Sequence, residues 1–258
     1  MNLKEKEKIT LSLIETFNKA GNLALDLRLK GLKKEIKSDN TPVSNGDLEV
    51  NKLLSNKIKE ITPNIAIVSE ENSEHKNDKD LKDFWLVDPI DGTRDYINNR
   101  DEFTLNAALI LDNKPSIGII TAPAKKRVFY SYGMSNCFEL IKNQQISLID
   151  KKKDHSEIKA VCYSNEIKPE ILEIHKKNNV TSHKKMKSSL KFCVVASGEF
   201  DIYVAEPRAC EWDIAAGHAL IVHSGGEVTD FAGNEILYGK PKFKNPSIII
   251  KNKNIING

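Results

Sequence analysis

The sequence predicts an α/β fold built from two parts with different architectures. Two segments near the N-terminus, residues 5–30 and the run that begins at Asp47, place apolar side chains at helical spacing. Apolar runs between residues 103 and 141 are separated by turn residues, which indicates an antiparallel sheet packed on these helices. Strand and helix patterns alternate over residues 153–258, which is typical of an α/β unit.

The composition is typical of a globular protein. The chain has 258 residues, of which 40% are hydrophobic and 29% are charged. Lysine plus arginine number 39 against 36 acidic residues, and the net charge of +3 does not indicate a nucleic-acid partner. No segment approaches the ~20 apolar residues of a transmembrane helix, and the charged N-terminus lacks the apolar run of a signal peptide. The four cysteines show no CxxC spacing, so we expect buried thiols in a reducing cytoplasm.

A polar run at residues 150–154 contains three consecutive lysines and separates the two parts. We interpret it as a solvated linker, with a basic patch as the alternative, because charge runs usually face solvent. The linker sets the boundary between an N-terminal α+β domain, residues 1–152, and a C-terminal α/β domain, residues 153–258.

Two helices are expected in the N-terminal part. Over residues 5–30 apolar positions recur every three or four residues, and Gly31 suits the C-terminal end of a helix. A polar loop, residues 37–47, follows. Asp47 then opens a second helix, and the simplest interpretation of this residue is an N-cap.

A short strand is expected over residues 65–68, and it ends at the acidic pair Glu70 and Glu71. From the residues alone, this pair is consistent with a solvated turn that leads into an exposed loop, residues 72–82.

The next apolar run, residues 84–87, is expected to be a buried strand that stops at Asp88. Pro89 cannot donate to a strand ladder, and it keeps the residue before it out of the helical region. An ordinary turn between two strands is one interpretation of this stretch.

A metal site is the other interpretation. Asp88 and Asp91 lie three residues apart on a rigid turn, and two such carboxylates repel each other unless a cation lies between them. Oxygen ligands suit Mg²⁺. Gly92 lets the backbone approach an anion closely, and Thr93 adds a hydroxyl group.

Further strands and helices follow the central motif. Residues 95–101 are polar and loop-like, and the strands expected after them are 103–110, 116–122, 127–132 and 137–141. In the C-terminal part we expect strands at 159–164, 200–205, 227–230 and 247–251, and helices at 169–177, 188–197 and 213–224. Asp213 begins the last of these helices, where it can cap the helix as well as bind a metal.

Two motifs in this order resemble the inositol monophosphatase-like family of Mg²⁺-dependent, lithium-sensitive phosphatases. They are Asp-Pro-Ile-Asp-Gly-Thr at residues 88–93 and Trp-Asp-Ile-Ala-Ala-Gly at residues 212–217. The resemblance extends from Lys37 to the C-terminal strand. It implies the family's α+β sugar-phosphatase fold, a layered α/β/α/β/α sandwich. It also implies hydrolysis of a phosphomonoester without a covalent enzyme intermediate.

The resemblance further implies a set of metal ligands. Glu70, Asp88 and the backbone carbonyl of Ile90 are expected to hold one Mg²⁺, while Asp88, Asp91 and Asp213 hold a second. Asp47 matches a residue near a further metal position, so two or three ions per site are expected. Paired metals clamp the attacking and leaving oxygens and lower the pKa of bound water.

Other roles concern the attacking water and the substrate. The resemblance implies that Glu70 and Thr93 orient the water, and it makes Asp47 a third catalytic residue. The implied substrate-binding residues are Glu70, Ile90, Asp91, Gly92, Thr93, Lys191 and Asp213. From its context alone, Lys191 is a lysine inside an apolar stretch, which either reaches along it to water or pairs with an anion.

Residues 102–106 and 188–193 are most similar to the 3′(2′),5′-bisphosphate nucleotidase branch of this family. Asp101 and Lys187 depart from that branch, which has glycine at both positions. The similarity implies hydrolysis of 3′-phosphoadenosine 5′-phosphate to AMP and phosphate, which clears a by-product of sulfate assimilation. A homodimer and peripheral contact with the inner face of the membrane are both compatible with it.

Three alternative functions remain at this point. The first is an inositol monophosphatase or a broad sugar phosphatase with the same metal site. The second is a catalytically silent regulator that binds metal or nucleotide, although the intact carboxylate set argues against it. The third is an RNA-binding module, for which the chain lacks clustered aromatic and basic residues.

Overall fold

The computed structural model describes residues 1–37, 40–71, 74–76, 78, 80–142, 144–149 and 157–256. The α-helices are α1 (Leu3–Lys30), α2 (Asn45–Ile61), α3 (Thr93–Ile97), α4 (Pro169–Lys177), α5 (Leu190–Ala196), α6 (Glu211–His223) and α7 (Lys253–Ile256). Short 3-10 turns lie at Pro123–Lys125 and Pro241–Phe243. The predicted domain boundary falls within residues 150–156, outside the described residues, so the division into two domains stays a prediction.

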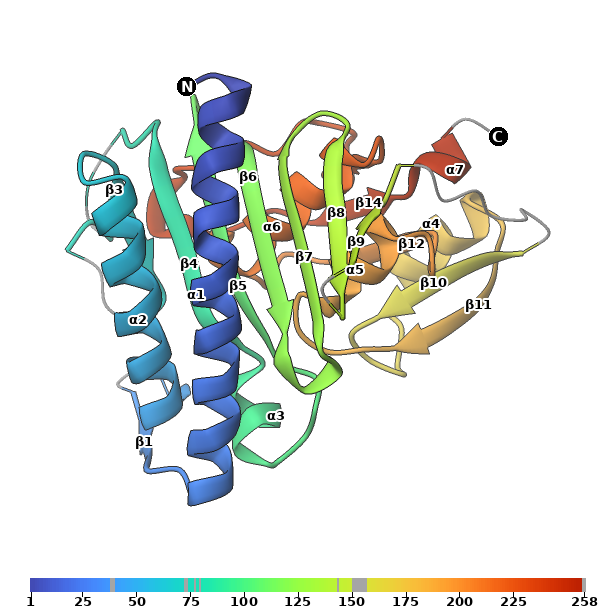
Figure 1. The fold of residues 1–258 in the computed structure, drawn as a ribbon. Coiled ribbons are helices and arrows are strands. Elements are labelled where there is room, and N and C mark those ends of the chain that lie inside the picture. The colour runs from blue at the N-terminus through green and yellow to red at the C-terminus, as the bar shows by residue number, and fades with distance from the viewer. Residues whose placement is uncertain are drawn as a thin grey trace.

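Helices α1 and α2 lie side by side on one face of a seven-stranded sheet (Figure 1). The order of its strands is β3-β4-β5-β6-β7-β8-β9. Their bounds are β3 (Ala66–Ser69), β4 (Phe84–Asp91), β5 (Thr104–Leu111), β6 (Lys114–Ala122), β7 (Arg127–Gly133), β8 (Asn136–Ile141) and β9 (Gln144–Ser147). Only the β3–β4 pair is parallel within this sheet.

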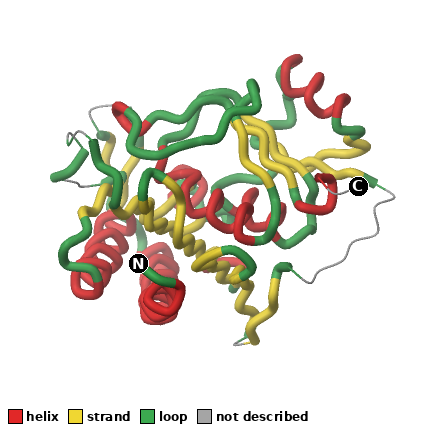
Figure 2. The backbone as a smooth tube through the Cα atoms, turned by 90° about the horizontal axis from the view of Figure 1, so that it is seen from above, coloured by secondary structure: helices red, strands yellow, loops and turns green. Residues whose placement is uncertain are grey.

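The opposite face of this sheet packs against α5 and α6, and a second sheet covers those helices in turn. The second sheet has five strands in the order β11-β10-β12-β14-β13. Their bounds are β10 (Ile158–Cys162), β11 (Val180–Lys185), β12 (Ile202–Ala205), β13 (Glu227–Thr229) and β14 (Ile248–Lys251). Helices α4 and α7 pack on its outer face. The layers therefore follow one another as α/β/α/β/α (Figure 2), which confirms the predicted fold class.

The structure differs from the sequence-based expectation around the central motif. Strand β4 does not stop at Asp88 but continues to Asp91. Asp88 lies opposite Asn106 and Asp91 lies opposite Thr104, so β4 carries one extra residue between them. This insertion is a β-bulge, and a bulge is a place where a sheet tolerates proline.

Other differences concern short or polar elements. The stretch that we expected to be a loop, residues 95–101, includes part of helix α3. Strand β9 and the exposed edge strand β11 were not predicted, and neither was a small hairpin of β1 (Lys34–Ile36) and β2 (Pro42–Ser44). These elements are short or solvent-exposed, and they lack the apolar periodicity on which the prediction depended.

The state of the cysteines and the absence of an apolar membrane-length segment were expected from the composition. All four cysteines are free thiols, and three of them are buried. Over the described part of the chain, no helix is both long enough and apolar enough to cross a membrane.

Helix α6 is wedged between the two sheets and packs closely on β6. A Cβ atom added at Gly118 of β6 would overlap the backbone carbonyl of Ala216 and would lie 2.8 Å from the Cβ of Ala219. The absence of a side chain at Gly118 therefore sets the separation between α6 and the sheet.

We expect Gly118→Ala to lower the free energy of unfolding by about 1–3 kcal/mol, because the methyl group would push α6 away from β6. Thermal unfolding measures this change. Lys114→Ala on the same strand is the control, since the Lys114 side chain forms an exposed ion pair with Glu235 whose loss should cost less than about 1 kcal/mol. Equal melting temperatures for Gly118→Ala and the wild type would contradict the close packing.

Candidate active site

The bulge in β4 places Asp88 in the interior of the protein. The Asp88 side chain is 1% exposed, and neither carboxylate oxygen has a hydrogen-bond partner among the residues that the structure describes. Buried polar atoms in folded proteins nearly always have a partner, so two orphaned oxygens indicate a missing ligand. A carboxylate accepts hydrogen bonds and donates none, so a cation is a ligand that fits this position.

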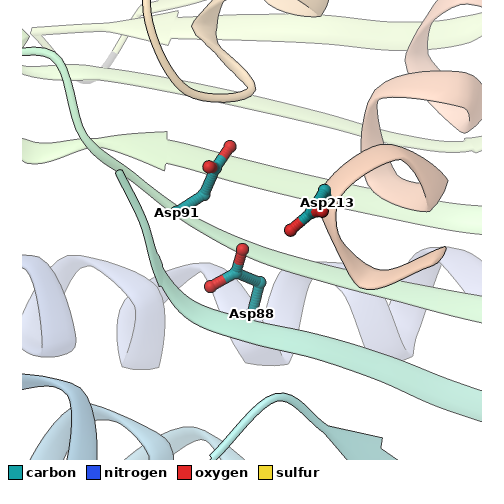
Figure 3. A group of neighbouring side chains, drawn as sticks. All are labelled: Asp88, Asp91 and Asp213. Atoms are coloured by element: carbon teal, nitrogen blue, oxygen red, sulfur yellow. The ribbon is translucent and has the colours of Figure 1, made fainter. Parts of the chain in front are cut away.

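Two further carboxylates converge on Asp88 from different elements (Figure 3). Asp91 lies at the end of β4, and Asp213 lies in the first turn of α6. One oxygen from each of the three side chains lies within 4.8 Å of the others. This oxygen-only set fits the ligands that Mg²⁺ prefers.

Asp213 has two functions in this arrangement. Its Oδ2 accepts a hydrogen bond of 2.6 Å from the backbone N–H of Cys210, which caps the first turn of α6. Cys210 is the N-cap of α6 and Asp213 is the third residue of the helix, so the helix begins two residues earlier than the sequence predicted. Asp213 nevertheless caps the first turn and lies beside the other two carboxylates. The cap also fixes the side chain, because it leaves the carboxylate little rotational freedom.

Ser189, directly before helix α5, forms hydrogen bonds with the carboxylate cluster. Its hydroxyl oxygen lies 2.7 Å from Oδ2 of Asp91 and 2.7 Å from the backbone carbonyl of Asp213. The side-chain amide of Asn106 donates a hydrogen bond of 3.0 Å to the same hydroxyl. The segment before α5 is thus hydrogen-bonded to both sides of the site.

Burial and repulsion by neighbouring carboxylates raise the pKa values of Asp88 and Asp213. Burial is the largest cause for Asp88, whose pKa lies well above its ordinary value, and the charges of Glu70, Asp91 and Asp213 add to it. Burial also raises the pKa of Asp213 to about 7, with further contributions from Asp91 and Glu70. A bound cation would oppose both effects, because it stabilises the charged form of each carboxylate.

Glu70 approaches the same cavity from the end of β3. Its backbone N–H donates to the carbonyl of Val87, at 3.0 Å, which holds it beside β4. Lys37 Nζ lies 3.3 Å from Oε1 of Glu70 and 2.7 Å from Oε1 of Glu71. Burial raises the pKa of Glu70, and it raises that of Glu71 to about 7. The acidic pair is therefore ion-paired and largely buried, unlike the solvated turn considered from the sequence.

Asp47 contacts the site indirectly. The N-cap of α2 is Ser44, and Asp47 is the third residue of the helix, so the predicted N-cap was misplaced by three positions. Oδ2 of Asp47 accepts bonds of 2.8 Å and 2.6 Å from the backbone N–H and hydroxyl of Ser44. Its Oδ1 lies 3.1 Å from the hydroxyl of Thr93, which is also 3.0 Å from the carbonyl of Ile90. Asp47 thus orients the Thr93 hydroxyl.

A cavity of about 440 Å³ collects the predicted residues. Except for Asp47, all the predicted site residues line it: Glu70, Asp88, Ile90, Asp91, Gly92, Thr93, Lys191 and Asp213. Lys191 is buried, its Nζ donates to the carbonyl of Ser188, and it lies 5.4 Å from the centre of the Tyr203 ring. Burial lowers the pKa of Lys191 to about 8, although Asp91 opposes the shift.

The cavity also holds cations that the sequence did not reveal as site residues. Arg94, Lys187 and Arg208 line it together with Lys191. Lys187 was noted only as a departure from glycine, and Arg208 lies in an irregular segment before α6 that carries no recognisable pattern. The acidic cluster and several cations therefore share one cavity.

Comparisons with known proteins agree with this geometry. A model of the inositol monophosphatase family matches residues 5–257. The 3′(2′),5′-bisphosphate nucleotidase CysQ of Buchnera aphidicola is 34% identical over 212 residues, which cover 81% of this chain and 78% of that protein. CysQ from Bacteroides thetaiotaomicron, a bacterial member of that family, superposes with a TM-score of 0.76 at 27% identity. That match covers 98% of this chain and 99% of the other.

A second similar structure contains a bound metal ion. It is an IMPase/NADP phosphatase complexed with Mg²⁺ and phosphate, with a TM-score of 0.77 and coverage of 99% of this chain and 95% of that one. At 17% identity, the likeness shows the fold alone. That protein binds Mg²⁺, and this chain has an acidic cluster whose oxygen ligands would suit the same ion.

The raised pKa values predict how pH affects the metal-free protein. The folded protein binds a proton at Asp213 more tightly than the unfolded chain does, so this stability is present below about pH 4 and is lost as pH rises towards about 7. In a chelator we expect the melting temperature to be about 5 °C or more higher near pH 5 than near pH 8.

Saturating Mg²⁺ should remove most of this difference, because the cation competes with protons for the same oxygens. Differential scanning calorimetry at both pH values, with and without Mg²⁺, checks the expectation. A metal-free protein that gains stability as pH rises over this interval would contradict the assigned repulsion.

Proposed function

This chain belongs to the inositol monophosphatase family, and we propose that it removes the 3′-phosphate of 3′-phosphoadenosine 5′-phosphate, releasing AMP and phosphate. The observation that carries the proposal is the cavity in which a carboxylate cluster and several cations occur together. The carboxylates suit the reaction centre, and the cations suit a substrate with more negative charge than one phosphate group. The name of the CysQ relative supports the same substrate.

The residues present fit a magnesium centre. Glu70, Asp88 and the carbonyl of Ile90 would hold one ion, and Asp88, Asp91 and Asp213 would hold another, with a third position near Asp47. When bound, Mg²⁺ supplies charge stabilisation for the phosphate oxygens and lowers the pKa of coordinated water. The orphaned oxygens of Asp88 and the close approach of Asp91 and Asp213 support this assignment.

The protein's own groups prepare the nucleophile. The Thr93 hydroxyl donates its hydrogen bond to Asp47 or to the Ile90 carbonyl, so its oxygen is free to accept a hydrogen bond from the attacking water. Glu70 is the base that accepts a proton from that water. Burial raises the pKa of Glu70 and the nearby Lys37 opposes that shift, and in its ionised form the carboxylate can accept the proton.

The backbone after the bulge receives the phosphate. Gly92 has φ of +93° and caps the short helix α3, and a Cβ there would lie 3.0 Å from the carbonyl of Glu102. Glycine therefore permits this turn, and the N–H groups of Gly92 and Thr93 are available for phosphate oxygens because the first turn of a helix provides no acceptor for them. Lys191 adds a buried positive charge for phosphate or ribose.

The principal alternative is hydrolysis of inositol phosphates or sugar phosphates by the same centre. Nothing in the carboxylate cluster distinguishes the substrates, because it acts only on the reacting phosphate. The cationic residues favour the nucleotide. Free thiols at all four cysteines are consistent with the reducing cytoplasm that we propose as the compartment.

We expect phosphate release from 3′-phosphoadenosine 5′-phosphate to exceed release from inositol 1-phosphate by at least about 10-fold in kcat/KM, and to need Mg²⁺. Li⁺ should inhibit it, as in the family. A coupled phosphate assay with both substrates, each with and without Li⁺, measures this preference. Asp213→Asn keeps the size of the side chain, removes one ligand charge and should reduce turnover by about 100-fold or more.

Each contrary outcome removes a different part of the proposal. A preference for inositol 1-phosphate would keep the metal centre and discard the nucleotide. No release from either substrate would favour the silent regulator. Unchanged turnover in Asp213→Asn would contradict the assigned ligand set.

A further inference from the structure

A pair of cations in the cavity, Lys187 and Arg208, is organised by one aromatic residue, Tyr163. The Arg208 guanidinium carbon lies 3.8 Å from the centre of the Tyr163 ring, so the two planar groups are in contact. Lys187 Nζ donates a hydrogen bond of 3.0 Å to the backbone carbonyl of Tyr163. All three residues line the cavity that contains the carboxylate cluster.

Tyr163 is itself held in place. Its hydroxyl donates a hydrogen bond of 2.5 Å to Oε1 of Glu206, and Lys168 forms an ion pair of 3.0 Å with the same carboxylate. Glu206 therefore contacts the hydroxyl end of the Tyr163 side chain. Lys187 and Arg208 therefore both contact a tyrosine whose position is fixed by hydrogen bonding, although Arg208 itself is exposed to solvent.

Nearby carboxylates offset the charges of these cations only in part. Within the described ranges of the chain, neither Lys187 nor Arg208 forms an ion pair with a carboxylate. Burial lowers the pKa of Lys187, and the charges of Lys185 and Arg208 also lower it, while Asp95 and Glu102 oppose the shift. Cations that repel one another in a shared cavity are stabilised when an anion lies between them, as the carboxylates are by a metal ion.

The cations lie a few residues along the chain from residues of the carboxylate cluster. Lys187 lies two residues before Ser189, which contacts Asp91, and Arg208 lies five residues before Asp213. The two segments that carry the cations therefore continue directly into the carboxylate cluster. A ligand that reaches from one to the other needs two anionic groups at a defined spacing.

We propose that Lys187 and Arg208, positioned by Tyr163, form an anion site for the second, non-reacting phosphate of the substrate. This inference rests on the proposed function, which supplies the 5′-phosphate of a bisphosphorylated nucleotide as the anion. Both cations can donate charge-assisted hydrogen bonds to phosphate oxygens, and the guanidinium can do so with two parallel N–H groups. Lys187 occupies a position at which the 3′(2′),5′-bisphosphate nucleotidase branch has glycine. This half of the anion site is therefore not part of the pattern of that branch.

The test compares two substrates that differ only in this phosphate, 3′-phosphoadenosine 5′-phosphate and adenosine 3′-monophosphate. The measured quantity is the ratio of their kcat/KM values. We expect Lys187→Met and Arg208→Met each to lower the ratio by about 10-fold, and the double variant by about 100-fold, since a charged hydrogen bond contributes roughly one order of magnitude or more. Lys187→Arg should restore most of the ratio, because it keeps the charge.

Lys184→Met is the matched control. Lys184 is an exposed lysine three positions before Lys187, and it does not line the cavity. Its removal changes the net charge by the same amount and should leave the ratio unchanged. A ratio that falls equally in this control would show a general effect of charge and would overturn the site.

A binding measurement separates the anion site from the reaction. AMP retains the second phosphate, whereas adenosine lacks it. Calorimetric titration should show AMP binding more tightly than adenosine to the wild type, and the double variant should lose most of that difference.

If both substrates lose activity equally in the double variant, the two residues are structural and the anion site is wrong. If the wild type does not prefer the bisphosphate and AMP binds no better than adenosine, the anion site is likewise wrong, while hydrolysis of either nucleotide keeps the proposed function. If the wild type hydrolyses neither nucleotide but binds AMP through these cations, the proposed function fails and the anion site stands.

Discussion

Repulsion among carboxylates, of which Asp88 is buried and Asp91 and Asp213 are half-buried, is the constraint on which the structure of this site depends. Asp88, Asp91 and Asp213 bring oxygens within 4.8 Å of one another, and Glu70 adds its charge from the end of β3. Bringing like charges together in a poorly hydrated place costs free energy, which the packing of the surrounding elements must offset. A divalent cation between the carboxylates attracts each of them and so offsets their mutual repulsion. The same geometry that would destabilise the metal-free protein would therefore favour binding of Mg²⁺.

The five-layer fold supplies the rigidity that such a cluster needs. Asp88 and Asp91 are separated by a bulge in a central strand, and Asp213 is fixed at the capped end of α6, which is wedged between the sheets. Gly118 and Gly217 permit that wedge, because a Cβ at either position would overlap the opposing helix backbone or the Phe192 ring. The proposed anion site lies on the segments that enter α5 and α6, so this packing also sets the spacing between the two halves of the cavity.

Much of this was readable from the sequence, for identifiable reasons. Long periodic segments such as residues 5–30 predicted their helices because burial of one face dictates the spacing. The carboxylates were predicted because Asp88 and Asp91 share one turn and a known motif. The bulge was missed because Pro89 shows that a ladder is interrupted, but not that the strand continues. Arg208 was missed because only tertiary packing brings it over the ring of Tyr163.

The most direct test of the account is the stability of Asp88→Asn without metal. Asparagine keeps the volume of the side chain and removes the charge that repels its neighbours. The account predicts that, in a chelator near pH 8, the variant melts at a higher temperature than the wild type, and that Mg²⁺ raises its melting temperature far less. A variant that melts at a lower temperature in the chelator, yet responds to Mg²⁺ as the wild type does, would contradict the central role of carboxylate repulsion.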